Sequence, residues 1–249
     1  MIELTQEIRP DIQKPLKKPN ELGLVPTWSY STLKTFEECA YRIYISKVKK
    51  IAADPGPAAK RGTEIHQQAE DYVNATLAEL PDTLIKFKDE FETLRRLYAE
   101  AKVELEGEWG FSLDWESVGW MQPNTWARIK LDALVNEDET SARVIDYKTG
   151  KKFGNEIGHG QQALLYAIAT FMRYPHLQYI QTEMWYLDKG ETTIKGYTRD
   201  QAMVFMPGIY RRAIAMTTTT KFEPNPSKTT CRWCAYHKGE YPECTWGVS

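Results

Sequence analysis

The segment 144–148, Val-Ile-Asp-Tyr-Lys, combines residue types that hydrolytic sites use. Side chains alternate along a strand, so Asp146 and Lys148 share a face. Asp132 lies in the preceding strand-like segment, and pairing of the two strands would bring two carboxylates together. Paired carboxylates suit Mg²⁺ or Mn²⁺, which polarise a phosphoryl oxygen and activate water. Lys148 can then orient that water or neutralise charge on the phosphate.

Three further side chains can complete such a site. His66 near the start of a predicted helix can add a nitrogen ligand, which favours Mn²⁺. Gln162 and Tyr166 are four residues apart and share a helix face, where an amide and a phenol can bind a phosphate or a base. A structural explanation stays open for all of them, because charged residues at strand ends and polar residues on helices are usually solvated or packed.

The cysteines indicate a second metal centre. Cys231 and Cys234 form a C-x2-C pair of the kind that binds one metal, and Cys244 follows closely. Cys39 stands alone far upstream, and as a fourth ligand it would join the two ends of the chain. In the alternative arrangement, His237 completes a zinc site with the three late cysteines, and Cys39 is a buried thiol.

An alternation of helices and strands has to position these residues. Apolar periodicity and turn signals predict helices over 31–48 (capped by Ser31), 60–80, 81–101, 156–174 and 199–217. They predict strands over 104–115, 125–135, 141–150, 176–188 and 191–198. Strict alternation would place Ile129, Leu131, Ala133 and Val135 on the face opposite Lys130, Asp132 and Leu134. The order predicts an α/β fold, a mixed central sheet flanked by helices.

Length and composition limit the class of protein. The 249 residues are 42% hydrophobic and 27% charged, as in a soluble globular protein. Residues 1–27 contain four prolines and are expected to form an extended arm, and residues 28–249 a single domain. No segment has the apolar length of a membrane span or a secretory leader, so we expect a cytoplasmic protein without membrane contact. The net charge of −2 excludes a globally basic nucleic-acid coat and permits a local basic groove.

The order of these motifs resembles the RecB-like branch of the PD-(D/E)xK nuclease superfamily. The residues that carry the resemblance are His66, Asp132, Asp146-Tyr147-Lys148 and Gln162-x3-Tyr166. Residues 29–39 resemble the opening helix of that branch, and the similarity spans 28–246. The resemblance implies a restriction-endonuclease-like core and a metal-dependent nuclease of phage or bacterial origin. Its metal ligands would be His66, Asp132, Asp146 and the carbonyl of Tyr147, and its catalytic lysine Lys148.

The resemblance also bears on the cysteines. RecB-like nucleases with one early and three late cysteines, such as the CRISPR-associated exonuclease family and the nuclease domain of AddB, hold a [4Fe-4S] cluster. This implies a cluster on Cys39, Cys231, Cys234 and Cys244. Two features depart from the family pattern. Ala40 replaces a frequent proline, and the gap before Cys244 is longer than usual, which keeps the zinc alternative open.

The implied function is a DNA exonuclease in recombination, repair or replication, acting on DNA ends or single strands, with protein partners in a recombination complex. The alternative is a nucleic-acid-binding subunit of a DNA-processing or CRISPR-adaptation-like assembly, whose nuclease centre acts only there. A non-nuclease metal protein is disfavoured, because all the motif residues are present. The candidate contacts to DNA phosphates are Lys60, Arg61, Lys151 and Lys152, and Trp233 and Tyr236 are candidates for stacking on bases.

Overall fold

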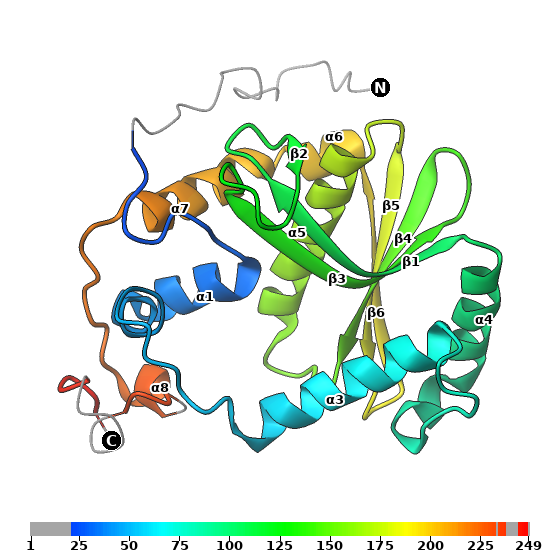
Figure 1. The fold of residues 1–249 in the computed structure, drawn as a ribbon, viewed down its shortest axis with the longest axis horizontal. Coiled ribbons are helices and arrows are strands. Elements are labelled where there is room, and N and C mark those ends of the chain that lie inside the picture. Colours follow the sequence, from blue (N-terminus) through cyan, green and yellow to red (C-terminus); the bar gives the residue numbers. More distant parts are fainter. Residues whose placement is uncertain (1–20, 233, 238–243, 249) are drawn as a thin grey trace, which may run out of the picture.

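The computed structural model describes residues 21–232, 234–237 and 244–248, and it places six strands in one sheet of order β2-β1-β3-β4-β5-β6. The strands are β1 (Val103–Phe111), β2 (Ser117–Val118), β3 (Ala127–Asn136), β4 (Ser141–Lys148), β5 (Tyr179–Tyr186) and β6 (Glu191–Thr198). The β4–β5 pair is parallel and the other pairs are antiparallel. The predicted mixed sheet is confirmed (Figure 1).

Helices cover both faces of this sheet (Figure 1). They are α1 (Tyr30–Glu38), α2 (Ala40–Ile43), α3 (Gly56–Val73), α4 (Lys88–Ala99), α5 (Glu156–Arg173), α6 (Arg199–Met203), α7 (Met206–Thr218) and α8 (Lys228–Cys231). A π-helical turn, η1 (Tyr44–Val48), follows α2, and a 3-10 turn, η2 (Asp82–Phe87), precedes α4. One core lies between the sheet and α5, α1 and α7, and a second lies between the sheet and α3 and α4.

Each core follows from the side chains at its centre. Ala163 and Ala167 on α5 are buried against Val144 and its neighbours, because small residues let the helix approach the sheet closely. On the other face, the ring of Phe91 lies 5.3 Å from that of Tyr147, centroid to centroid. Burial of one large apolar side chain contributes roughly 1.5–3 kcal/mol, so these two layers hold β4 from both sides.

The β3–β4 hairpin and the helix after it bring the motif residues together. Ala133 pairs with Ile145 as the last pair of this ladder, so Asp132 and Asp146 come opposite each other one position further on. The parallel pairing of β4 with β5 requires a crossover, and α5 forms it. The helix packs over this face of the sheet, most closely against β5, and its first turns lie near Lys148 at the end of β4.

The single helix predicted over 31–48 is wrong. Ser29, not Ser31, caps α1, since its side chain accepts from Thr32 N and the Thr32 side chain binds Ser29 N in return. The helix then ends at Cys39, whose backbone is extended (φ −163°, ψ 103°). The chain resumes as α2 and the π-helical turn η1. Cys39 therefore lies at the break between α1 and α2 and not within a helix.

Other helix boundaries also differ from the sequence prediction. The helix expected over 60–80 begins at Gly56 and ends at Val73, before a turn. The helix expected over 81–101 starts as the 3-10 turn η2, and the one expected over 199–217 is divided into α6 and α7 around Val204 and Phe205. Pro207 stands in the first turn of α7, where a missing N–H costs no helical hydrogen bond.

The strict alternation predicted for β3 is wrong near its middle. Leu131 packs in the core with α5, whereas Ala133, two residues on, packs in the core with α3 and α4. The neighbouring β1 changes face in the same way, because Leu105 packs in the core with α3 and α4, whereas Trp109 packs in the core with α5. Between these two residues, Glu106 has a left-handed backbone with φ of 49°. This conformation rotates the strand, so residues two apart no longer share a face.

The predicted N-terminal arm is partly tested, since residues 1–20 lie outside the described ranges. The rest of it is docked: Gly23 N donates to Thr217 O, and Val25 is buried. Trp28 then pairs with Ala127 at the start of β3 and is almost fully buried. Within the described ranges, no helix combines the length and the apolar character needed to cross a membrane.

Candidate active site

A cleft of about 510 Å³ opens between α3, the β1–β3–β4 part of the sheet and the first turns of α5. Its charged and titratable lining residues are His66, Glu70, Glu106, Lys130, Asp132, Asp146 and Lys148. All four of the predicted site residues His66, Asp132, Asp146 and Lys148 therefore line one cleft, although they come from three different elements.

Asp146 lies where β4 meets α5. Its Oδ1 accepts a hydrogen bond of 2.7 Å from Tyr166 OH and a longer one of 3.4 Å from Gln162 Nε2. Lys148 Nζ lies 2.5 Å from the other oxygen, Oδ2. This ion pair occupies Oδ2, so both oxygens of the buried carboxylate have partners in the protein. A carboxylate is a hard oxygen donor, which suits coordination of a divalent cation.

Gln162 and Tyr166 share the predicted helix face, and that face is turned to Asp146. Gln162 Nε2 donates to Tyr166 OH over 2.6 Å, and Gln162 Oε1 accepts from Lys148 Nζ over 2.9 Å. The amide and the phenol thus hold the carboxylate and the ammonium group in fixed positions. In this arrangement they orient the other site residues.

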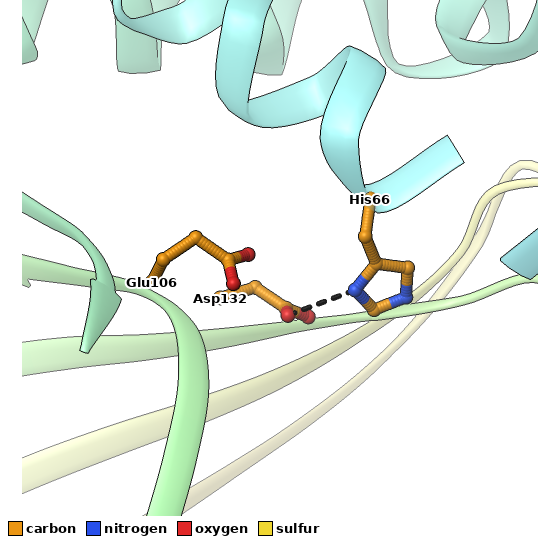
Figure 2. A group of neighbouring side chains, drawn as sticks. All are labelled: His66, Glu106 and Asp132. Atoms are coloured by element: carbon orange, nitrogen blue, oxygen red, sulfur yellow. Dashed lines mark hydrogen bonds and ion pairs between the residues drawn. The ribbon is translucent and has the colours of Figure 1, made fainter. Parts of the chain in front are cut away.

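Asp132 is bound from two sides. Its Oδ1 lies 2.9 Å from His66 Nδ1 (Figure 2). Its Oδ2 accepts a 2.6 Å hydrogen bond from Tyr147 N. The backbone of β4 therefore fixes the carboxylate of β3, and the carboxylate orients the imidazole of α3. The ring of His66 also lies edge-on to that of Tyr147, with centroids 5.7 Å apart.

Glu106 is a site residue that the sequence did not single out. One ligand atom each from His66, Glu106 and Asp132 lie within 4.8 Å of one another, and Figure 2 shows the three side chains converging from α3, β1 and β3. Lys130 Nζ lies 2.6 Å from Glu106 Oε2. In sequence, Glu106 stands between two similar residues, Glu104 and Glu108, and only its left-handed backbone distinguishes it.

The electrostatics of the site favour bound positive charge. Burial raises the pKa of Asp132, and the nearby charge of Asp146 adds to the rise, against the hydrogen bond from His66, which lowers it. Burial lowers the pKa of His66, but the hydrogen bond to Asp132 and the surrounding carboxylates outweigh it, so this pKa is raised. Both shifts arise because several carboxylates share a poorly solvated cleft with one imidazole. The donor set of one nitrogen and three carboxylates fits a divalent cation such as Mg²⁺ or Mn²⁺.

The four cysteines also come together. Cys39, Cys231, Cys234 and Cys244 line one hollow beside α2. Backbone N of Asn225 lies 3.5 Å from Cys39 Sγ. Among the described residues, His66, Glu106 and Asp132 are the group of three or more metal-binding side chains whose ligand atoms lie within 4.8 Å of one another. The four cysteine sulfurs are therefore spaced more widely than the ligands of a single tetrahedral ion. His237 does not line this hollow, and its Nε2 lies 3.0 Å from Val248 O.

Most of the predicted DNA contacts already have protein partners. Arg61 donates two hydrogen bonds to Asp188, of 2.9 and 2.7 Å, and Lys60 lies 3.1 Å from Asp54. Lys152 Nζ lies 5.8 Å from the centre of the Tyr186 ring, and Lys151 is exposed. Binding of DNA by these four residues stays a prediction.

The two predicted stacking residues have different outcomes. For Tyr236 the structure favours the alternative to stacking on bases, packing beside the cysteines, because its ring is buried with Cys234 and its OH donates to Ile51 O over 2.7 Å. Trp233 lies outside the described residues.

Comparison with solved structures finds similar chain paths at low sequence identity. The crystal structure of SSO0001 has 12% identity and a TM-score of 0.46, over 87% of this chain and 86% of that one. An alkaline exonuclease from Laribacter hongkongensis has 12% identity and a TM-score of 0.38, over 78% and 87%. The same exonuclease in complex with dAMP gives 12% identity and a TM-score of 0.39, over 77% and 86%. No curated protein sequence matches this chain.

A family model gives the stronger result. The model of the PD-(D/E)XK nuclease superfamily matches residues 27–238, which is most of the chain. The matched range contains the cleft, and Asp146-Tyr147-Lys148 fits the (D/E)XK pattern of the family name. The chain belongs to the PD-(D/E)XK nuclease superfamily.

Proposed function

We propose that this protein is a metal-dependent deoxyribonuclease that hydrolyses phosphodiester bonds, and that it acts as an exonuclease in DNA recombination, repair or replication. One observation carries the proposal. In a chain of the PD-(D/E)XK nuclease superfamily, His66, Asp132, Asp146 and Lys148 line a single cleft and are held there by hydrogen bonds and ion pairs.

The cation would be held by His66, Asp132, Asp146 and the carbonyl of Tyr147, with Glu106 as a further carboxylate ligand. When bound, a divalent cation supplies positive charge for the phosphate and lowers the pKa of water. Two features support this ligand set: one ligand atom each of His66, Glu106 and Asp132 lie within 4.8 Å of one another, and several carboxylates share a poorly solvated cleft.

Lys148 supplies the second positive charge. Its ammonium group is held between Gln162 Oε1 and Asp146 Oδ2, 2.9 and 2.5 Å away. Lysine has only donors, so it can hydrogen-bond a phosphate oxygen or the oxygen of the attacking water. Preorganised donors of this kind stabilise the charge that develops in the transition state.

We also propose a [4Fe-4S] cluster on the four cysteines, which would place the protein in the iron–sulfur branch of RecB-like nucleases. The support is that Cys39 lines the same hollow as the three late cysteines, whereas His237, which the zinc alternative requires, does not. A four-iron cluster takes four thiolates and spreads them more widely than one zinc ion does.

The nuclease proposal is tested on end-labelled single-stranded and blunt duplex DNA with Mn²⁺, beside a closed circular substrate. We expect nucleotides to be released from ends, with the circle left intact. Asp146→Asn should abolish cleavage, and Lys148→Gln should lower turnover more than metal affinity. The matched control is Glu183→Gln, a buried carboxylate held by Arg143 outside the cleft, which should stay active.

Two results would contradict this assignment. Full activity of the Asp146→Asn protein would show that this cleft is not the active site. If the protein binds DNA but cleaves it only after partner proteins are added, the alternative function, a subunit of a DNA-processing assembly, would be favoured instead.

A further inference from the structure

A second hollow, of about 460 Å³, adjoins the catalytic cleft. The two share Lys130, Gln162 and Tyr166 as lining residues. Its other walls come from residues 24–32 and from Trp120 in the loop before β3. We call this hollow the side groove. Since Gln162 and Tyr166 both hydrogen-bond Asp146, the side groove opens directly beside the catalytic carboxylates.

The side groove and the catalytic cleft differ in charge. The side groove is lined by Lys47, Arg128 and Lys130, and no described residue that lines it is an aspartate or a glutamate. The cleft beside it has four carboxylates. Lys130 is paired with Glu106, so Lys47 and Arg128 are the cations that the side groove can offer to a ligand. In a chain of net charge −2, a concave surface with these two cations and no carboxylate among its described lining residues complements a polyanion.

Trp120 gives the side groove an aromatic wall. Its ring is half-buried, and the Arg128 guanidinium lies 5.6 Å from the ring centre. Arg128 Nε also donates to Trp120 O over 3.0 Å, so one arginine holds both the backbone and the ring. An indole plane fixed in this way, beside one cation, is suited to stack on a nucleobase.

We propose that the side groove binds a single DNA strand next to the scissile phosphate, with a base stacked on Trp120 and phosphates beside Lys47 and Arg128. The inference rests on the proposed function for its substrate class. The volume lies in the range of small-ligand pockets, about 300–1,000 Å³, which accommodates a nucleotide or two and not both strands of a duplex. Trp120 is then a specificity-determining residue for single strands.

The test measures binding without cleavage. Anisotropy of a fluorescent oligothymidylate is titrated with protein in EDTA. Trp120→Ala should weaken binding by about 5- to 150-fold, the range for one lost base stack, and Trp120→Phe should restore most of it. Lys47→Gln should lower the slope of log Kd against log salt by about 0.7, the value for one phosphate contact on a single strand. The matched controls are Tyr98→Ala and Lys88→Gln on α4, which should leave binding unchanged.

The outcomes separate this inference from the nuclease proposal. If the protein cleaves DNA and its Trp120→Ala and Lys47→Gln variants bind and cleave normally, the side groove is not the single-strand site. The nuclease proposal would be unaffected by that result. Affinity for blunt duplex equal to that for single strands would also overturn it. A protein that binds single strands through Trp120 but cleaves no DNA would support the side groove and contradict the nuclease. If Trp120→Ala fails to fold, Lys47→Gln decides the question, because Lys47 is exposed and lines the same groove.

Discussion

Removal of one buried hydroxyl tests whether α5 controls the metal site. Tyr166 OH donates to Asp146 Oδ1 over 2.7 Å, and the alternative donor to that oxygen, Gln162 Nε2, is 3.4 Å away. Tyr166→Phe keeps the ring and removes this hydrogen bond, together with the one that Tyr166 OH accepts from Gln162 Nε2. Hydrogen bonds to charged groups contribute about 1.5–3 kcal/mol. If the hydroxyl serves to hold Asp146 in its metal-binding position, the variant loses that amount from metal affinity.

The expected result is a weaker apparent affinity for Mn²⁺, by about 10- to 150-fold, since about 1.4 kcal/mol corresponds to a factor of ten. The assay is the rate of DNA cleavage as a function of Mn²⁺ concentration. At saturating Mn²⁺ the turnover should approach that of the wild-type protein, because Lys148 keeps its contact with Gln162. The free energy of unfolding, measured in urea without metal, should also fall.

Tyr174→Phe is the matched control. Its OH donates to Glu104 Oε2 over the same 2.7 Å, but neither residue lines the catalytic cleft. This variant should lose stability without any change in the Mn²⁺ dependence. If Tyr166→Phe and Tyr174→Phe show the same Mn²⁺ dependence as the wild-type protein, the hydroxyl on α5 does not position Asp146, and the reasoning is refuted.

Other predictions concern single residues. Glu106→Gln should weaken Mn²⁺ binding in calorimetry by at least about tenfold, and unchanged affinity would exclude Glu106 from the metal site. Protein purified without oxygen should be brown and hold about four irons per chain. Cys39→Ser should lose the colour and His237→Ala keep it, whereas one zinc and no iron would contradict the cluster. Hydrogen bonds from Ser141 and Thr140 lower the pKa of Asp138 to about 2. The ionised Asp138 should therefore stabilise the fold above the unfolded pKa of about 3.9, and this contribution should be lost as pH falls through about 2. Asp138→Asn should flatten the pH dependence of the free energy of unfolding in urea between these two values. A variant whose pH dependence runs parallel to that of the wild-type protein would disprove the prediction.

Local sequence pattern was enough to predict the elements that carry the proposed catalytic residues. The β3–β4 hairpin, the helix of Gln162 and the β5–β6 pair lie close to where periodicity and turn residues predict them. Strands β3, β4 and β5 are buried on both faces, so apolar residues dominate their sequences, and this burial is the physical cause of the signal. The segment 31–48 misled the prediction, because its apolar spacing is helical throughout, whereas capping by Ser29 and the extended backbone of Cys39 divide it.

What the sequence by itself determined is the chemistry along each element: Asp146 and Lys148 share a strand face because the strand period is two, and Gln162 and Tyr166 share a helix face because they are four residues apart. Only the tertiary structure decided which elements meet. Glu106 joins His66 and Asp132 through a left-handed backbone that no residue pattern shows. Lys47 and Trp120, far apart in the chain, face one groove. Such contacts depend on the packing of whole layers, whereas periodicity reports only on near neighbours in sequence.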